Sequence, residues 1–269
     1  MSIHKPDSKP TLTFLEVQII CEEWVNKLQL EGLPIFFDYI EQPYNKKTFQ
    51  KGIVLWDEEE KAWHIELYEL IDKRAIIHEL GHIYFAKILN DWYFVASCKV
   101  SKQRFRKMNY EITRYFNRLL DCFVDYHLTK FEGFYDAFVT YISSDLKEYP
   151  DPQRYDSRKF LFYYLKAYID CYHILKSTDQ NKFLPEIESH LIKIRNLVIT
   201  KVRREKNKLS FKRFQNLDQK LDLFNEIKDS LESKVIVKFM FDTLNLFRFW
   251  SFEELRYNFN LYFNLYSKR

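Results

Sequence analysis

The sequence predicts an α+β protein that is mostly α-helical, with one small antiparallel or mixed three-stranded sheet in its N-terminal part. The 269 residues include only 4 glycines and 7 prolines, and so few helix breakers favour long helices. Three short β-type runs lie close together between residues 34 and 70. Elsewhere the apolar residues recur mainly at the helical spacing of three and four.

The first predicted helix begins after Thr13 and ends near Gly32. Thr13 and Glu16 have the spacing of a capping box. Gly32 can adopt the left-handed conformation that commonly stops a helix. Between them the apolar residues follow the helical period: Phe14, Val17, Cys21, Trp24, Val25 and Leu28.

Three strands should follow this helix, separated by turn-like segments. They are expected within residues 34–42, 51–59 and 61–70. In the third run, Trp63, Ile65 and Leu67 alternate with more polar residues, as in a strand that has one face in water. We expect a small sheet in which this third strand has a free edge.

Two long helices are predicted after the sheet. Asp72 is a suitable N-cap for a helix over residues 72–89, which should end at Asn90. A second helix is expected from about residue 103 to residue 130, with a stop near Gly133. The sheet should pack on these two helices.

The clearest break in the chain is EYPDPQRYD, residues 148–156, because two prolines disfavour helix there. It divides the sequence into an expected core domain, residues 11–149, and an all-helical C-terminal region, residues 150–269. The C-terminal region should contain four or five helices.

Composition and charge exclude several classes of protein. A membrane span needs about 18 consecutive apolar residues, and no stretch of the sequence approaches this length. No export signal is apparent either, so we expect a cytoplasmic protein that does not enter membranes. The 4 cysteines form no CxxC pair, which favours reduced thiols over a disulfide framework or a thiolate zinc site. The net charge of +4 permits an acidic partner without requiring one.

The segment HELGH, His78 to His82, is the strongest chemical signal. Two histidines four residues apart lie on the same face of a helix, so both imidazoles can reach one cation. Zinc suits neutral imidazole ligands and a site with one open position. Glu79 is placed to accept a proton from an attacking water.

This HExxH arrangement resembles the zincin metallopeptidases. The resemblance implies zinc-dependent hydrolysis of peptide bonds in a protein or peptide substrate, with Glu79 as the general base. It also implies that an extended substrate pairs with the free edge of the strand in residues 61–70.

Gly81 lies inside the motif helix, where glycine costs about 1 kcal/mol relative to alanine. A surface helix gains nothing from this residue, whereas close approach of a neighbouring chain near a metal would explain it. The surrounding positions are uncharged, as a buried helix requires: Ile76, Ile77, Leu80, Ile83 and Tyr84.

A catalytic zinc normally has three protein ligands, so one more is needed. The metzincin pattern would continue with glycine and histidine where this chain has Phe85 and Ile88, which excludes that branch. The third ligand should therefore come from the second long helix, where Asn117, Asp121 and Asp125 form a polar stripe among large apolar residues. Coordination of a metal would satisfy a carboxylate in such surroundings.

Asp121 is our choice as the third ligand, with Asp125 and Asn117 orienting the imidazoles. The pattern N-x-x-x-D-x-x-x-D is similar to that of predicted metallopeptidase domains often found beside von Willebrand A-type domains, whose second helix carries an aspartate ligand. That group commonly has asparagine at the last position, so the choice between the two aspartates stays open. Glu111 is the competing ligand, but it lies about 80° around the helix from Asp121 at about 100° per residue.

Several other residues are weaker candidates. Three histidines could stabilise an oxyanion, although each is more often a packed or surface residue, and three tyrosines have the same standing. They are His64, His127, His173, Tyr110, Tyr115 and Tyr126.

The run from Lys193 to Phe214 is strongly basic with interspersed aromatic residues. Such a composition can hold a phosphate backbone, and it is more often the solvated face of a helix. The alternative function is therefore a nucleic-acid-associated protein that docks through residues 193–214. Its metal site would then either cleave bound proteins or be purely structural.

Overall fold

The computed structural model of the chain describes most of the expected elements. The described residues are 12–40, 52–57, 59–68, 72–90, 106–147, 157–175, 184–204 and 221–247. Contacts divide the chain into two compact units, residues 1–97 and 98–269. The expected fold class is confirmed, since the chain is mostly helical with one small mixed sheet packed against helices.

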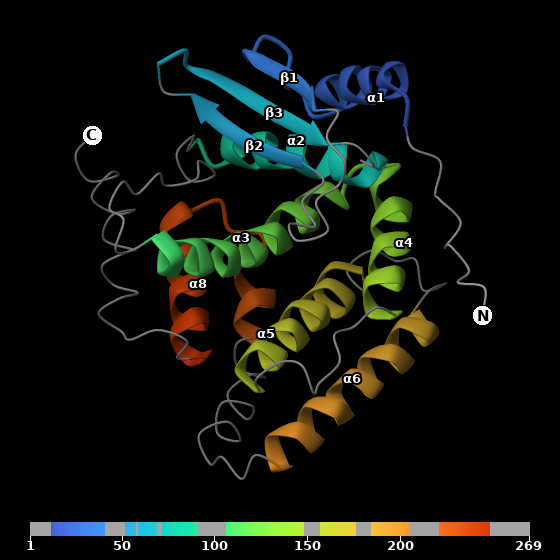
Figure 1. The fold of residues 1–269 in the computed structure, drawn as a ribbon, viewed down its shortest axis with the longest axis vertical. Coiled ribbons are helices and arrows are strands. Elements are labelled where there is room, and N and C mark those ends of the chain that lie inside the picture. Colours follow the sequence, from blue (N-terminus) through green and yellow to red (C-terminus); the bar gives the residue numbers. More distant parts are fainter. Residues whose placement is uncertain are drawn as a thin grey trace, which may run out of the picture. The chain divides into compact units, whose positions relative to one another are not determined.

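The first unit contains a three-stranded sheet with the strand order β1-β3-β2 (Figure 1). The strands are β1 (Ile35–Ile40), β2 (Gly52–Asp57) and β3 (Ala62–Tyr68). β1 runs parallel to β3, and β2 runs antiparallel to it. The connection from β2 to β3 is held by Asp57, whose Oδ1 accepts hydrogen bonds from the backbone N–H groups of Glu59 and Glu60 at 2.7 and 2.9 Å.

The expectation that the third strand has a free edge is wrong. β3 is the central strand, and its two sides pair with β1 and β2. Pairing with β1 begins where the N–H of Trp63 donates to the carbonyl of Pro34 at 2.8 Å. An alternating pattern shows which face of a strand is wet, but it carries no information on which strands lie beside it. Among the described strands, the edges of the sheet are β1 and β2.

The two faces of the sheet differ as the alternation in β3 predicted. Val54, Ile65 and Leu67 are buried on one face, which Gly52 shares. The helix α2 (Lys73–Ile88) packs on this face. His64 lies on the other face and is half-buried.

The helix α1 (Phe14–Lys27) has the predicted capping box. The N–H of Thr13 donates to Glu16 Oε2 at 2.7 Å, and the N–H of Glu16 donates to Thr13 Oγ1 at 3.3 Å. The helix ends earlier than expected, because Gln29 already adopts a left-handed φ of 54°. Gly32 is also left-handed, with a φ of 83°, but it lies beyond the helix in the turn that leads into β1.

The helix α2 begins where predicted. The side chain of Asp72 caps it by accepting a hydrogen bond from the N–H of Ala75 at 2.8 Å. Asn90 follows its last turn with a left-handed φ of 50°, which confirms the expected stop. Ten of its 16 residues are buried, including both motif histidines, so α2 is the core helix of the first unit.

The described residues of the second unit form helices joined by short turns. Its elements are α3 (Arg106–Leu128), α4 (Phe134–Lys147), α5 (Ser157–Tyr168), the π-helix η3 (Ile169–Leu175), α6 (Leu184–Arg204) and α8 (Ser233–Phe247) (Figure 1). α3 is the predicted second long helix, and Gly133 follows it with a φ of 90°. Phe123 of α3 packs at the centre of this unit, with ring centroids 4.9 Å from Phe224 and 5.8 Å from Phe239.

The proline-containing break at residues 148–156 lies outside the described residues, and a domain boundary at residue 150 stays a prediction. Contacts instead divide the chain between residues 97 and 98. The reason is that α3 packs against α4, α5, η3 and α8, all of which follow it in the sequence.

Candidate metal centre

The two motif histidines lie on the buried helix α2 in the arrangement that their spacing predicts. Each has an exposed fraction of 8%. Their rings meet edge to face, with centroids 4.8 Å apart and an interplanar angle of 86°. Because four residues make slightly more than one helical turn, the two imidazoles project from the same side of α2.

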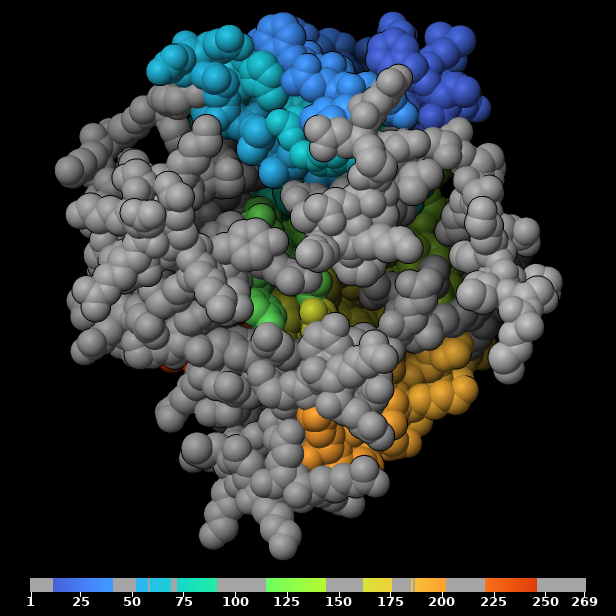
Figure 2. Space-filling model, in the orientation of Figure 1, coloured from blue at the N-terminus to red at the C-terminus, as the bar shows by residue number. Residues whose placement is uncertain are grey.

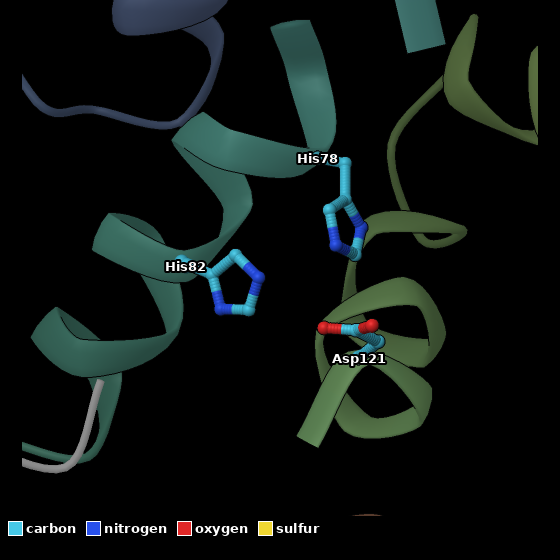
Figure 3. Close-up of side chains that lie close together, drawn as sticks. All are labelled: His78, His82 and Asp121. Carbon is cyan, nitrogen blue, oxygen red and sulfur yellow. The ribbon is translucent and has the colours of Figure 1, made fainter. Parts of the chain in front are cut away.

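Asp121 of α3 completes a group of three side chains that could hold a metal ion. One ligand atom from each of His78, His82 and Asp121 lies within 4.8 Å of the other two, and Figure 3 shows the three side chains turned toward a common point. Both histidines are buried and Asp121 is half-buried. Two imidazoles with one carboxylate are a donor set that first-row divalent metals accept.

The polar residues of α3 become less exposed to solvent from Asn117 to Asp125. Asn117 is exposed, Asp121 is half-buried, and Asp125 is completely buried, with an exposed fraction of 0%. Of the two aspartates left open by the sequence, Asp121 is the one in the group with the histidines. The side chain of Glu111, the competing ligand, lies outside the described residues.

Glu79 points from α2 toward the beginning of β2. A Cβ atom placed on Gly52 would lie 2.9 Å from Cγ and 3.4 Å from Cδ of Glu79. The side chain of Glu79 therefore occupies space that any residue larger than glycine would need. Sequence reasoning missed Gly52, although a glycine inside a strand often marks the close approach of another group.

Gly81 is buried within α2, which is compatible with another chain segment packing closely against it. The expectation that it makes room for an approaching chain near a metal stays a prediction.

A second group of possible metal ligands lies on the β2–β3 hairpin. Ligand atoms of Asp57, Glu60 and His64 are within 4.8 Å of one another. His64 Nε2 is 3.2 Å from Glu60 Oε2, and its Nδ1 is 3.8 Å from Asp38 Oδ2. The Glu60 side chain is 61% exposed, and exposed acidic groups commonly gather without a metal, so polar contacts within the hairpin are a sufficient account of this cluster.

The other histidine candidates belong to the packing of the second unit. Burial lowers the pKa of both His127 and His173 to about 4, with Lys130 adding to the effect at His127 and Lys228 at His173. The ring of His173 packs 5.8 Å from Tyr168 and 5.9 Å from Phe224. Both imidazoles are therefore neutral at physiological pH.

Two of the tyrosine candidates also have structural partners. Tyr115 packs edge to face against Phe162, with centroids 4.7 Å apart, and the hydroxyl of Tyr126 donates to Asp229. The side chain of Tyr110 lies outside the described residues.

No protein-family model, curated protein or solved structure matches the chain. The zincin resemblance therefore depends on the motif itself and on the residues gathered around it.

The basic run is described as far as residue 204 and belongs to α6, part of which Figure 2 shows at the surface in orange. Lys193 and Arg195 are exposed on it. They lie beside the exposed apolar residues Ile192 and Leu197, so the described part of the run is the outer face of an amphipathic helix. Nucleic-acid binding by this run stays a prediction. In the described part of the chain, no helix combines the length and apolar character needed to cross a membrane.

Proposed function

We propose that this chain is a zinc-dependent peptidase in which His78, His82 and Asp121 hold the metal and Glu79 acts as the general base. The observation that carries the proposal is the gathering of these three ligand side chains beside the glutamate of an HExxH motif. Neutral imidazoles and a carboxylate suit zinc, and three protein ligands leave a position open for hydrolytic chemistry. A bound zinc ion would supply Lewis acidity that polarises a substrate carbonyl.

The chain's own residues account for the rest of the reaction. Glu79 follows His78 directly, so its carboxylate can take a proton from an attacking water and pass it to the leaving amine. Proton transfer of this kind contributes about 10² to 10⁴ in rate. Because both histidines are buried, bulk water has little access to their ligand atoms.

An extended substrate would bind along β2 in this proposal. Main-chain hydrogen bonds to a sheet edge are a common way of holding a peptide. β3 has both sides paired, whereas β2 is an edge among the described strands and begins at Gly52, next to Glu79.

Metal analysis of the purified protein tests the ligand set. We expect about one zinc per chain in the wild type, and a large loss in His78→Ala and Asp121→Asn. Asp125→Asn is the matched control on the same helix, and it should still take up one zinc at saturating metal, although loss of an orienting group can weaken affinity about 10- to 100-fold. Equal zinc in the wild type, His78→Ala and Asp121→Asn would exclude this site.

A separate variant tests the chemistry. Glu79→Gln keeps the size of the side chain but removes the base, so it should retain zinc and lose cleavage of a mixed peptide library by at least about 10²-fold. Unchanged cleavage in this variant would show that the reaction does not use Glu79.

A further inference from the structure

The contact between Gly52 and Glu79 suggests a role for a residue outside the motif. Gly52 is the first residue of β2 and pairs across the hairpin with Leu67 of β3. It is buried, and its neighbours on the same face, Val54 and Ile65, are buried as well. The absence of a side chain at position 52 thus leaves a notch in an otherwise filled apolar face.

Glu79 fills this notch. A methyl group on Gly52 would stand 2.9 Å from Cγ of Glu79, and it would also lie 3.4 Å from the backbone oxygen of Glu66. Nonbonded carbon atoms prefer separations of about 3.5 to 4.0 Å. The aliphatic part of Glu79 is therefore seated where the side chain of residue 52 would otherwise be.

The backbone of Gly52 gives no other reason for glycine. Its φ lies outside the left-handed region, in contrast to that of Gly32 at +83°. Alanine can adopt the conformation of Gly52, so a substitution there changes the contact with Glu79 and leaves the strand geometry allowed.

We propose that Gly52 is a positioning residue for Glu79, because the space left by the absence of a side chain at position 52 determines where the Glu79 side chain lies. The catalytic meaning of this role rests on the proposed peptidase function. The contact between Glu79 and Gly52 does not depend on the proposed function, and stability measurements can test it without an activity assay.

Gly52→Ala pushes the Glu79 side chain out of its seat and leaves the histidines untouched. Since a displacement of about 1 Å can cost about 10²-fold in rate, kcat should fall by about 10- to 100-fold. Zinc content and KM should stay close to those of the wild type, which a general loss of structure would not allow. Ile65→Val changes the same face of the sheet by one carbon but lies in the fully paired strand β3, and this control should keep kcat within about twofold. A wild-type kcat in Gly52→Ala would overturn the proposal.

A thermodynamic cycle tests the contact itself. Gly52→Ala should lower the midpoint of thermal unfolding when Glu79 is present, and the decrease should vanish when Glu79 is replaced by alanine. Equal shifts in both backgrounds would overturn the seating of Glu79 on Gly52. If cleavage does not depend on Glu79 but the cycle is non-additive, the peptidase assignment fails and the positioning of Glu79 by Gly52 stands.

Discussion

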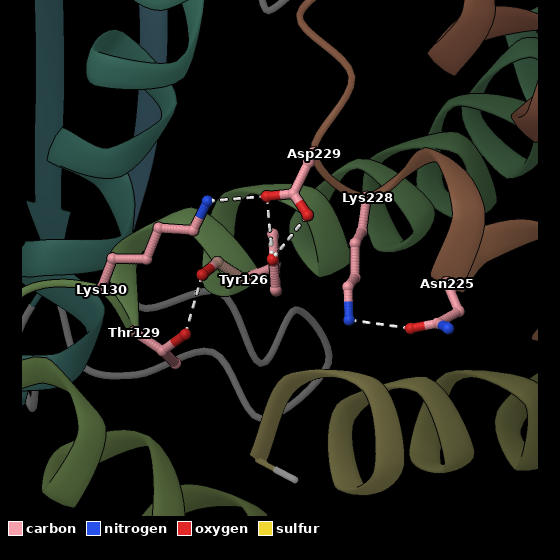
Figure 4. A network of polar contacts seen from close by, with 6 residues as sticks. All are labelled: Tyr126, Thr129, Lys130, Asn225, Lys228 and Asp229. Carbon is pink, nitrogen blue, oxygen red and sulfur yellow. Dashed lines mark hydrogen bonds and ion pairs between the residues drawn. The ribbon is translucent and has the colours of Figure 1, made fainter. Parts of the chain in front are cut away.

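The hydroxyl of Tyr126 donates to both carboxylate oxygens of Asp229, at 2.9 and 3.0 Å, and so links positions 103 residues apart in the sequence (Figure 4). Lys130 Nζ donates to the same carboxylate at 2.9 Å. The ammonium groups of Lys130 and Lys228 lie 4.6 and 5.2 Å from the centroid of the Tyr126 ring. Burial raises the pKa of Tyr126 and Asp229 adds to the effect, so the phenol remains a donor at neutral pH. The end of α3 is thereby attached to the turn that follows residues 221–227.

Removal of this hydroxyl should loosen the attachment. Tyr126→Phe keeps the ring between the lysines and deletes the hydrogen bond, so we expect a loss of about 1 kcal/mol in the free energy of unfolding. Lys130→Met should cost less, because both members of that ion pair are largely exposed. Urea unfolding curves measure both changes, and an unchanged midpoint in Tyr126→Phe would contradict the role of the hydroxyl.

A second polar pair is buried within the second unit. Lys166 Nζ lies 2.6 Å from Asp170 Oδ2, and the two side chains are only 13% and 2% exposed. Burial opposes the charge of Lys166, but the Asp170 carboxylate outweighs this effect together with the neighbouring groups of Cys122, Tyr141 and Asp125, so the pKa of Lys166 is well above its usual value. The pair joins α5 to the first turn of η3.

Breaking this pair on one side should be costly. Lys166→Met leaves the Asp170 carboxylate buried without its counterion, and we expect a loss of about 3 to 5 kcal/mol in the free energy of unfolding. The double variant Lys166→Met with Asp170→Leu should be much closer to the wild type, because a buried ion pair can be replaced by apolar side chains. Denaturant unfolding of the single and double variants checks this, and additive losses would argue against the pair.

Acid should destabilise the second unit through its buried histidines. The pKa of His127 and of His173 is lowered from 6.5 to about 4 by folding, so between these pH values the unfolded chain binds more protons than the folded chain. Stability is therefore fully present above pH 6.5 and decreases as pH falls toward about 4. The measurement is the free energy of unfolding against pH, with a chelator present so that metal release does not contribute.

The substitution His173→Phe separates this effect from general acid sensitivity. Phenylalanine can keep the contacts with Tyr168 and Phe224 but cannot be protonated. The dependence of stability on pH between 6.5 and 4 should become shallower in this variant. The same slope in the variant and the wild type would remove His173 from the explanation.

The features that the sequence predicted best depend on near neighbours in the chain. The capping box of Thr13 and Glu16, the N-cap at Asp72 and the stop at Asn90 each involve residues within one helical turn, so local chemistry determines them. The left-handed residue at the end of α1 is Gln29 instead of the expected glycine. The N–H of Leu30 donates to the carbonyl of Val25 at 2.8 Å across this left-handed residue, so the helix ends in a local capping motif that the preference for glycine did not reveal.

Local sequence patterns could not predict the order of the strands in the sheet. The alternation of β3 correctly gave its wet face, but pairing with β1 and β2 depends on contacts between distant segments. His78 and His82 could be proposed as ligands because one helix presents both. Asp121 could be proposed because a carboxylate on an apolar helix needs a partner. The role of Gly52 could not be predicted, because only the fold brings this residue close to Glu79.

Zinc should stabilise the protein through His78, His82 and Asp121 and not through the hairpin group of Asp57, Glu60 and His64. A metal that binds only the folded chain stabilises it by about 2.7 kcal/mol when its free concentration is 100 times the Kd. The hairpin group has two carboxylates and one imidazole, and its glutamate side chain is 61% exposed, so it should bind zinc much more weakly.

Thermal unfolding with and without zinc distinguishes the two groups. We expect zinc to raise the midpoint for the wild type and for His64→Ala by similar amounts, and to have little effect on His82→Ala. His64 is a matched control because it is the histidine of the other candidate group, whose three residues all lie in the first unit. If His64→Ala abolishes the shift while His82→Ala preserves it, zinc binds at the hairpin, and HELGH loses its role as a metal site.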